Sequence, residues 1–198
     1  MRENINLWDQ SDFMRGLNDT LLLSGQNKYA TAIILSFHRI TGRLMFSNAG
    51  HLPPLWYHAR QQTWGWLRED DDPLARKGWG LPIGLIPGTN YRQTVGTLEP
   101  SDLLVLYTDG VTEAENHAGE SLDREQLLKW ARETPSASPE ALGWALLKRF
   151  ESFQGRCRSD DETLIVLQRE EAPVVASKGD AAANHSVPQQ VELEAGAL

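Results

Sequence analysis

The feature that most constrains the fold is an unbroken apolar run at residues 103–107 (LLVLY), followed by Thr108-Asp109-Gly110. Such a run is typical of a strand that is buried on both faces, so a covering layer is expected on either side of it. A carboxylate emerges at Asp109, where this strand ends, and strand ends hold a ligand more rigidly than free loops do. Asp109 is therefore a candidate ligand, and Gly110 would let the backbone turn there. The alternative is that Asp109 only caps the turn, as Asp-Gly often does.

The segments around this run alternate between strand-like and helix-like patterns. Residues 1–27 have apolar side chains at helical spacing, namely Trp8, Phe13, Leu17 and Leu21. Predicted strands cover residues 29–37, 44–46, 55–57, 63–67, 91–98 and 163–167, and a loop covers 69–89. Predicted helices cover 123–133 and a segment that starts with Ser138-Pro139 and ends at Gly155. Hairpins dominate over parallel alternation, so we expect an antiparallel α+β layer fold.

Composition limits the classes of function. The formal net charge is −8 over 198 residues, which argues against non-specific binding to nucleic acid because phosphates are repelled. Cys157 is the single cysteine, so no internal disulfide is expected. The N-terminus has no apolar signal-peptide region, and no apolar run has the length of a membrane span. These features predict a soluble, cytoplasmic protein with no membrane or nucleic-acid partner. Residues 170–198 lack apolar periodicity and are predicted to be a disordered tail.

A second acidic group precedes the last predicted strand. Asp160, Asp161 and Glu162 are adjacent, and such carboxylates repel one another. They are tolerated on a solvated loop, or they are stabilised by a hard cation. Both interpretations stay open on these residues alone. A similar triplet at residues 70–72 is interpreted as a solvated loop, because no buried strand lies beside it.

Two further segments carry candidate residues. His51, in the turn-like stretch 48–54 (NAGHLPP), could act as a base or a ligand, but a lone histidine after a tight turn is more often a structural hydrogen-bonding group. Residues 80–85 (GLPIGL) contain glycines that could allow close approach to a phosphate or form a moving flap. This stretch lacks the Lys-Ser/Thr ending and the helix start of a phosphate loop. Its alternative interpretation is a rigid apolar turn.

Taken in order, these segments resemble the SpoIIE/RsbU-type branch of the metal-dependent protein phosphatase (PPM) family. The resemblance runs from about Leu17 to Leu167. The segments that carry it are 29–32 (YATA) with 41–44 (TGRL), then 48–54 (NAGHLPP), 104–114 (LVLYTDGVTEA) and 160–164 (DDETL). Each segment is weakly specific by itself, and their order and spacing make the set specific. On this basis residues 1–169 are expected to be the C-terminal part of such a phosphatase domain.

The resemblance implies an α-β-β-α sandwich of two antiparallel sheets with a binuclear Mn²⁺ or Mg²⁺ site at one end. It implies removal of phosphate from serine or threonine of a protein substrate, commonly an anti-sigma-factor antagonist. Asp109 and Asp160 match the family's metal-binding aspartates, with Asp161 and Gly110 in supporting positions. Gly84 would shape a loop near the cleft, and His51 would serve fold geometry, together with Asn48. A metal-activated water would be the nucleophile, so no catalytic side chain is assigned.

The sequence departs from the family pattern in one respect. The family's Gly-Asp motif and its Asp-x-x-Gly-His-Gly motif each supply an aspartate to the metals, and neither stands ahead of the matched segments in this chain. We therefore expect an N-terminally incomplete sandwich whose exposed sheet edges favour aggregation or a homodimer. Three interpretations stay open: a fragment of an active phosphatase, a non-catalytic module that binds phosphoproteins or regulates a paralogue, or a domain completed by another chain.

Overall fold

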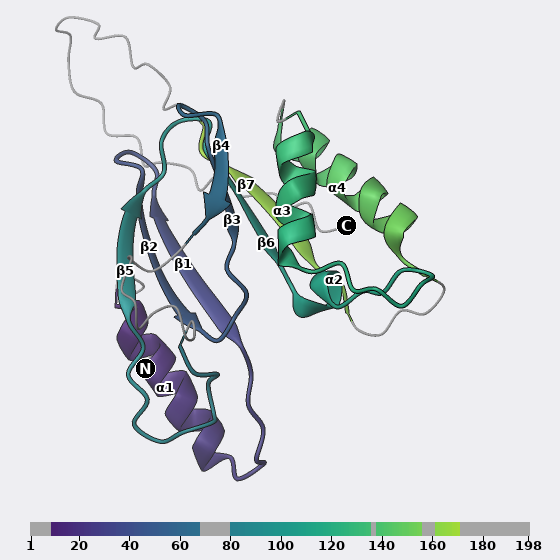
Figure 1. Ribbon diagram of the computed structural model, residues 1–198. Coiled ribbons are helices and arrows are strands. Elements are labelled where there is room, and N and C mark those ends of the chain that lie inside the picture. The colour runs from purple at the N-terminus through teal and green to yellow at the C-terminus, as the bar shows by residue number, and fades with distance from the viewer. Residues whose placement is uncertain (1–8, 68–79, 136–137, 156–160, 171–198) are drawn as a thin grey trace, which may run out of the picture.

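The computed structural model describes residues 9–67, 80–135, 138–155 and 161–170. These residues form four layers (Figure 1). Helix α1 (Gln10–Leu23) covers the outer face of one sheet, and helices α3 (Arg124–Glu133) and α4 (Pro139–Phe153) cover the outer face of the other. The predicted α-β-β-α sandwich is therefore confirmed.

Both sheets are antiparallel throughout. The first contains, in spatial order, β1 (Ala32–His38), β2 (Arg43–Ala49) and β5 (Gln93–Thr97). The second contains, in spatial order, β4 (Thr63–Trp66), β3 (Leu55–His58), β6 (Leu103–Tyr107) and β7 (Leu164–Gln168). Short hairpins join β1 to β2 and β3 to β4, as the turn residues predict.

Strand β6 is buried on both faces, as its apolar run predicts. Leu104 and Leu106 point between the sheets, where they pack with Leu44 and Phe46 of β2. Leu103, with Val105 and Tyr107, points the other way into the core beneath α3 and α4. Because side chains alternate along a strand, one apolar set of β6 faces the other sheet and the second set faces the helices.

The two helices over the second sheet begin at residues that the sequence marks as caps. The Asp123 side chain accepts a hydrogen bond from the backbone N–H of Gln126 at 2.8 Å, and α3 follows. Ser138 accepts one from the N–H of Ala141 at 3.1 Å, with Pro139 opening α4. Each side chain satisfies a backbone donor that the first turn of a helix leaves without a partner.

Helix α1 ends earlier than the prediction and buries polar side chains beside its apolar stripe. It ends at Leu23 rather than continuing to residue 27, because Ser24 caps it and Gly25 turns away with φ +67°. Its most buried side chains are Gln10, Met14 and Asn18, and the neighbouring stripe residues among the described ones are half-buried. The sheet supplies acceptors for the amide nitrogen of Gln10, and the loop after residue 80 supplies partners for both the nitrogen and the oxygen of Asn18.

Local boundaries also shift from the prediction at two places. Strand β1 starts at Ala32 instead of residue 29, and Ala30 instead forms an isolated bridge with Ile83. The predicted turn at Asp109-Gly110 is a one-turn helix, α2 (Asp109–Thr112). Gly110 is buried within α2, where the chain turns from β6 into the helix. Its supporting role at the site stays a prediction.

One side of the space between the sheets is open. β1 and β7 are end strands of their sheets, and Arg169, directly after β7, lies against Gly42 in the β1–β2 turn. Along these two strands the inward-facing Phe37, Ile165 and Leu167 are 38%, 43% and 47% exposed. Apolar side chains that face a core are normally covered, so this side of the described part of the sandwich is only partly covered. That the edge results from an incomplete domain stays a prediction.

None of the helices in the described ranges combines the length and the apolar character that crossing a bilayer requires. The predicted tail lies almost entirely outside these ranges, as do Cys157, Asp160 and the acidic triplet at residues 70–72. The domain boundary at residue 169 and the disorder of the tail therefore stay predictions.

Candidate metal and phosphoryl site

Strand pairing brings the two predicted acidic motifs to one end of the second sheet. β6 and β7 are antiparallel neighbours with Tyr107 opposite Leu164, so the end of β6 adjoins the start of β7. Thr108 joins these ends with three hydrogen bonds. Its N–H donates to the carbonyl of Thr163 at 3.1 Å, and its hydroxyl donates to the carbonyl of Asp161 at 3.1 Å. The same hydroxyl oxygen accepts from the N–H of Thr163 at 2.9 Å.

Asp109 and Asp161 therefore lie at adjoining strand ends, and we call this pair the carboxylate edge. Both residues are exposed to solvent. One carboxylate oxygen of Asp109 accepts a hydrogen bond from the N–H of Gly110 at 3.1 Å. Behind it, Val111 and Ala114 are buried in the core beneath α3 and α4, which anchors α2. Asp109 therefore presents a carboxylate to solvent from a short helix whose other side is packed in the core.

Buried Tyr107 links this edge to the turn that contains His51. Its hydroxyl donates to the carbonyl of Pro53 at 3.0 Å. Burial raises the pKa of Tyr107 well above its ordinary value, so the hydroxyl keeps its proton and remains a donor. Tyr107 lies two residues before Asp109, and Pro53 lies two residues after His51, so this bond places the His51 turn beside the carboxylate edge.

The side chain of Asn48 holds the His51 turn in place. Its oxygen accepts from the N–H of His51 at 2.8 Å, and its amide nitrogen donates to the carbonyl of His51 at 3.0 Å. Partial burial lowers the pKa of His51, and the negative charge of Asp109 acts in the opposite direction. His51 is thus close enough to Asp109 for the carboxylate charge to affect its pKa. Its Nδ1 lies 3.5 Å from the hydroxyl of Thr31.

The glycine loop after residue 80 lies behind this turn. A side chain at Gly80 would collide with the carbonyl oxygen of Asn48, and one at Gly50 would press against Pro82 at 3.1 Å. Gly84 is further away, and its nearest neighbours are Leu21 of α1 and the carbonyl of Lys28. These contacts tie Gly84 to α1 rather than to the carboxylate edge. Its assignment to a cleft loop stays a prediction.

The donor chemistry of the carboxylate edge suits a hard divalent cation, because carboxylate oxygens are the ligands that Mg²⁺, Mn²⁺ and Ca²⁺ prefer. The number of donors falls short. Within the described ranges there is no group of three or more His, Cys, Asp or Glu residues arranged to hold a metal. Asp160, the second predicted ligand, lies outside those ranges. The described residues alone therefore form part of a metal site and not a whole one.

The fold and this edge can now be compared with known proteins. The family model described as "Stage II sporulation protein E (SpoIIE)" matches residues 3–170. The chain belongs to the SpoIIE family. The match covers all the elements of the sandwich and both acidic motifs.

Curated relatives of this SpoIIE-family chain are longer proteins. It is 28% identical over 141 residues to "Phosphoserine phosphatase RsbU" of Bacillus subtilis (strain 168), which covers 71% of this chain and 39% of the relative. It is 27% identical over 128 residues to "Protein IcfG" of Synechocystis sp., covering 65% of this chain and 19% of that protein. The chain therefore spans well under half the length of these two relatives.

Solved structures support the fold assignment. The RsbU and RsbW domains of Rv1364c from Mycobacterium tuberculosis align with a TM-score of 0.65 at 22% identity, over 81% of this chain and 42% of that one. The phosphatase domain of SpoIIE from Bacillus subtilis, presoaked with Mn, aligns with a TM-score of 0.62 at 18% identity, over 92% of this chain and 74% of that one. At 22% and 18% sequence identity, these structural alignments establish the sandwich fold alone.

The sequence predicted Asp109 and Asp160 as metal ligands with Asp161 beside them, and these roles stay predictions. It did not anticipate two features of the carboxylate edge. The first is Thr108, whose side chain and backbone join the ends of β6 and β7. Its position directly before Asp109 was the available signal, but its partners lie more than fifty residues away. The second is the closeness of His51 to the charge of Asp109, which depends on how the two sheets stack.

Proposed function

We propose that this chain carries the catalytic face of a metal-dependent serine/threonine protein phosphatase of bacterial signalling. The observation that supports this most is the carboxylate edge, held rigidly by Thr108 at one end of a SpoIIE-family sandwich. The substrate class is a phosphorylated protein, of the anti-sigma-factor-antagonist type. The cofactor is Mn²⁺ or Mg²⁺, and the location is the cytoplasm.

The names of the relatives support this substrate class. RsbU of Bacillus subtilis is named a phosphoserine phosphatase, and the Mycobacterium tuberculosis chain carries RsbU and RsbW domains together. A phosphatase that is joined to such a partner domain would act on a protein and not on a metabolite. An acidic chain also needs local cations to hold a phosphoryl group, which a metal at the carboxylate edge would provide.

In this proposal Asp109 and Asp160 are metal ligands, and Asp161 is a neighbouring acceptor. Bound metal would acidify a water and neutralise charge on the phosphoryl oxygens. The chain's own contribution is positional. Thr108 fixes the two strand ends, Val111 anchors α2, and the open surface at Asp109 leaves room for a phosphorylated side chain. The further ligands would come from residues outside the described ranges or from another polypeptide.

A non-catalytic role is the alternative, and a specific observation favours it. Within the described ranges, no three His, Cys, Asp or Glu residues are grouped so that they could hold a metal. A chain of this kind could still bind a phosphoprotein or regulate a paralogue. It would do so through the same exposed face, without turnover.

The test is hydrolysis of an aryl phosphate by the purified chain, with Mn²⁺ and with EDTA, beside Asp109→Asn. We expect the variant to abolish metal-dependent turnover, because an amide lacks the negative charge that holds the cation. Glu151→Gln, which removes an exposed carboxylate on α4, serves as the control and should keep full activity.

Full activity in Asp109→Asn would show that the site assignment is wrong. A folded wild-type chain without turnover that still binds a phosphoserine peptide would favour the non-catalytic alternative. Circular dichroism of each variant establishes that the chain is folded before either conclusion is drawn.

A further inference from the structure

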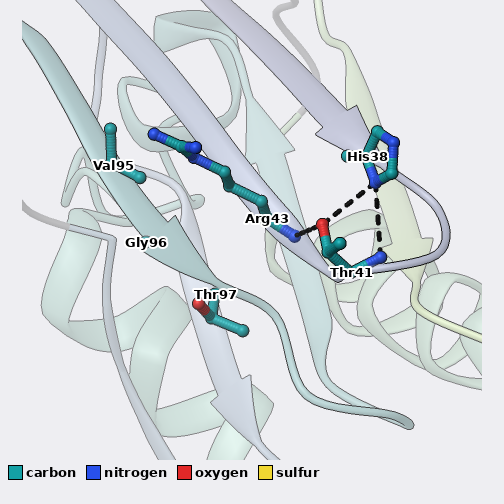
Figure 2. Close-up of a pocket in the computed structure, with 6 residues that line it drawn as sticks. All are labelled: His38, Thr41, Arg43, Val95, Gly96 and Thr97. Atoms are coloured by element: carbon teal, nitrogen blue, oxygen red, sulfur yellow. Dashed lines mark hydrogen bonds between the residues drawn. The ribbon is translucent and has the colours of Figure 1, made fainter.

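The outer face of the first sheet has a cavity at the end opposite the carboxylate edge. Its volume is about 550 Å³. It is lined by His38, Thr41, Arg43, Val95, Gly96 and Thr97 (Figure 2). Leu44 and Phe46 point between the sheets, so Arg43 faces the outer side. Helix α1 starts at Gln10, which bonds to Ser36 and Met45, so among the described residues α1 does not extend over the cavity.

Arg43 is the main charged group in this cavity. Its side chain reaches from β2 toward Val95 on β5, and the Thr97 hydroxyl lies further along β5 (Figure 2). Arg43 is exposed and makes no ion pair with any residue in the described part of the chain. In a protein of net charge −8, a guanidinium without a carboxylate partner offers several donors to an incoming anion.

The wall of the cavity is held by the turn between β1 and β2. The N–H of Thr41 donates to Nδ1 of His38 at 3.3 Å, so Nδ1 presents its lone pair and the neutral ring carries its proton on Nε2. The Thr41 hydroxyl lies 3.0 Å from the same nitrogen and accepts from the N–H of Arg43 at 3.3 Å. This chain of bonds fixes the backbone from which Arg43 projects.

We propose that this cavity binds the carboxylates of an acidic peptide segment, as a second contact with the protein substrate. The inference rests on the proposed function for the identity of the partner, and on Arg43 and Thr97 for the chemistry. A guanidinium binds a carboxylate through two parallel hydrogen bonds, and Val95 beside it offers an apolar contact for the side-chain stem of an incoming glutamate. A volume of about 550 Å³ accommodates several side chains rather than a single small ion.

The position of the cavity suits a docking contact and not a second reaction centre. Arg43 and Ala49 are the two ends of β2, so at about 3.3 Å per residue the cavity lies roughly 20 Å from the His51 turn. One phosphorylated residue cannot span that distance. A partner protein could place its phosphorylated residue at the carboxylate edge and an acidic segment at Arg43.

The test is fluorescence anisotropy with a fluorescein-labelled glutamate-rich peptide, and with a glutamine version of it as the neutral control. We expect the glutamate peptide to bind the wild-type chain, with affinity that falls as salt rises. Arg43→Gln should weaken binding about tenfold or more, which is the usual size of a lost charge-assisted hydrogen bond. Arg39→Gln, which removes an exposed arginine from the same hairpin, should bind as the wild type does.

Asp109→Asn separates this proposal from the proposed function. It should lose turnover and keep the wild-type affinity for the glutamate peptide, because the carboxylate edge is remote from Arg43. Equal binding by wild type and Arg43→Gln, or no binding of the glutamate peptide at all, would overturn the docking site. So would Arg43-dependent binding of a single-stranded oligonucleotide in place of the peptide.

Discussion

Two aspartates at opposite ends of β6 differ in their exposure to solvent and in their hydrogen-bond partners. Asp102, just before the strand, is only 2% exposed. Its carboxylate accepts from the indole N–H of Trp56 at 3.1 Å and from the backbone N–H groups of Ala59 and Glu99 at 2.8 and 2.9 Å. Asp109, just after the strand, is exposed. The sequence shows an acid in a turn-like context at both ends, so only these partners separate a structural carboxylate from a candidate ligand.

The titration of His51 gives a prediction at the residue scale. Partial burial lowers its pKa in the folded chain, so the unfolded chain takes up this proton first as the pH falls. The corresponding stability is present above the unfolded value of about 6.5 and is lost as the pH falls toward the folded pKa. In EDTA, the free energy of unfolding should therefore fall more steeply from neutral to acidic pH for the wild type than for His51→Gln. Urea titrations at a series of pH values would measure the free energy of unfolding of both proteins. Parallel plots of that free energy against pH would contradict the prediction.

Among the elements, α1 shows how tertiary partners add polar groups to a face that a periodic pattern predicts. The apolar stripe predicts one buried face, and the structure also buries the amides of Gln10 and Asn18 beside it. The Asn18 oxygen accepts from the N–H of Gly84 at 2.9 Å and from the hydroxyl of Tyr91 at 3.2 Å. A buried amide with such partners costs little, so the helix is oriented by polar contacts as well as by apolar area.

The docking of the glycine loop on α1 is testable through Gly84→Ala. Gly84 has φ +81°, and an added Cβ would lie 2.5 Å from Leu21 and 2.6 Å from the carbonyl oxygen of Lys28. We expect a loss of about 3 kcal/mol in the free energy of unfolding, from backbone strain and overpacking together. Gly88→Ala is the matched control, because Gly88 has φ +69° and open space around it, and it should lose only about 1 kcal/mol. Equal losses in urea denaturation would show that the loop does not pack tightly on α1.

At the scale of the whole molecule, the apolar side chains between the layers are well covered except along the side formed by β1 and β7. The helices cover the outer faces, and Leu44, Phe46 and Leu104 fill the space between the sheets. Along β1 and β7 the same inner faces remain partly uncovered, and in the described part of the chain each of these strands pairs with a neighbouring strand on one side only. Such an edge favours pairing with a further strand from any source, which includes a second copy of this chain.

The open side predicts concentration-dependent self-association. Replacing both Ile165 and Leu167 with lysine should lower the weight-average mass in analytical ultracentrifugation, because charge on an edge opposes strand pairing. Stability should fall by about 2 kcal/mol, since both inward-facing side chains are slightly more than half buried. Trp144→Lys on α4 is the control, because Trp144 is 58% exposed but lies on a helix. An equal effect from that control would indicate general hydrophobic association instead of edge pairing.

The sequence by itself determined the features that depend on neighbours along the chain. The run at residues 103–107 predicts a strand buried on both faces, and Ser138-Pro139 predicts the start of α4. Asp109 emerges as a candidate ligand for the same reason, because it directly follows that strand. Periodicity, caps and turns are local properties, so one stretch of sequence contains all the information they need.

The tertiary structure decided the features that depend on distant partners. Asp161 joins Asp109 only because β7 pairs beside β6, and Thr108 then holds the two ends together. The buried face of α1 and the attachment of Gly84 to it follow from hydrogen bonds across more than sixty residues. No local pattern encodes those contacts, because the free energy that selects them comes from burying polar and apolar groups of separate elements against one another.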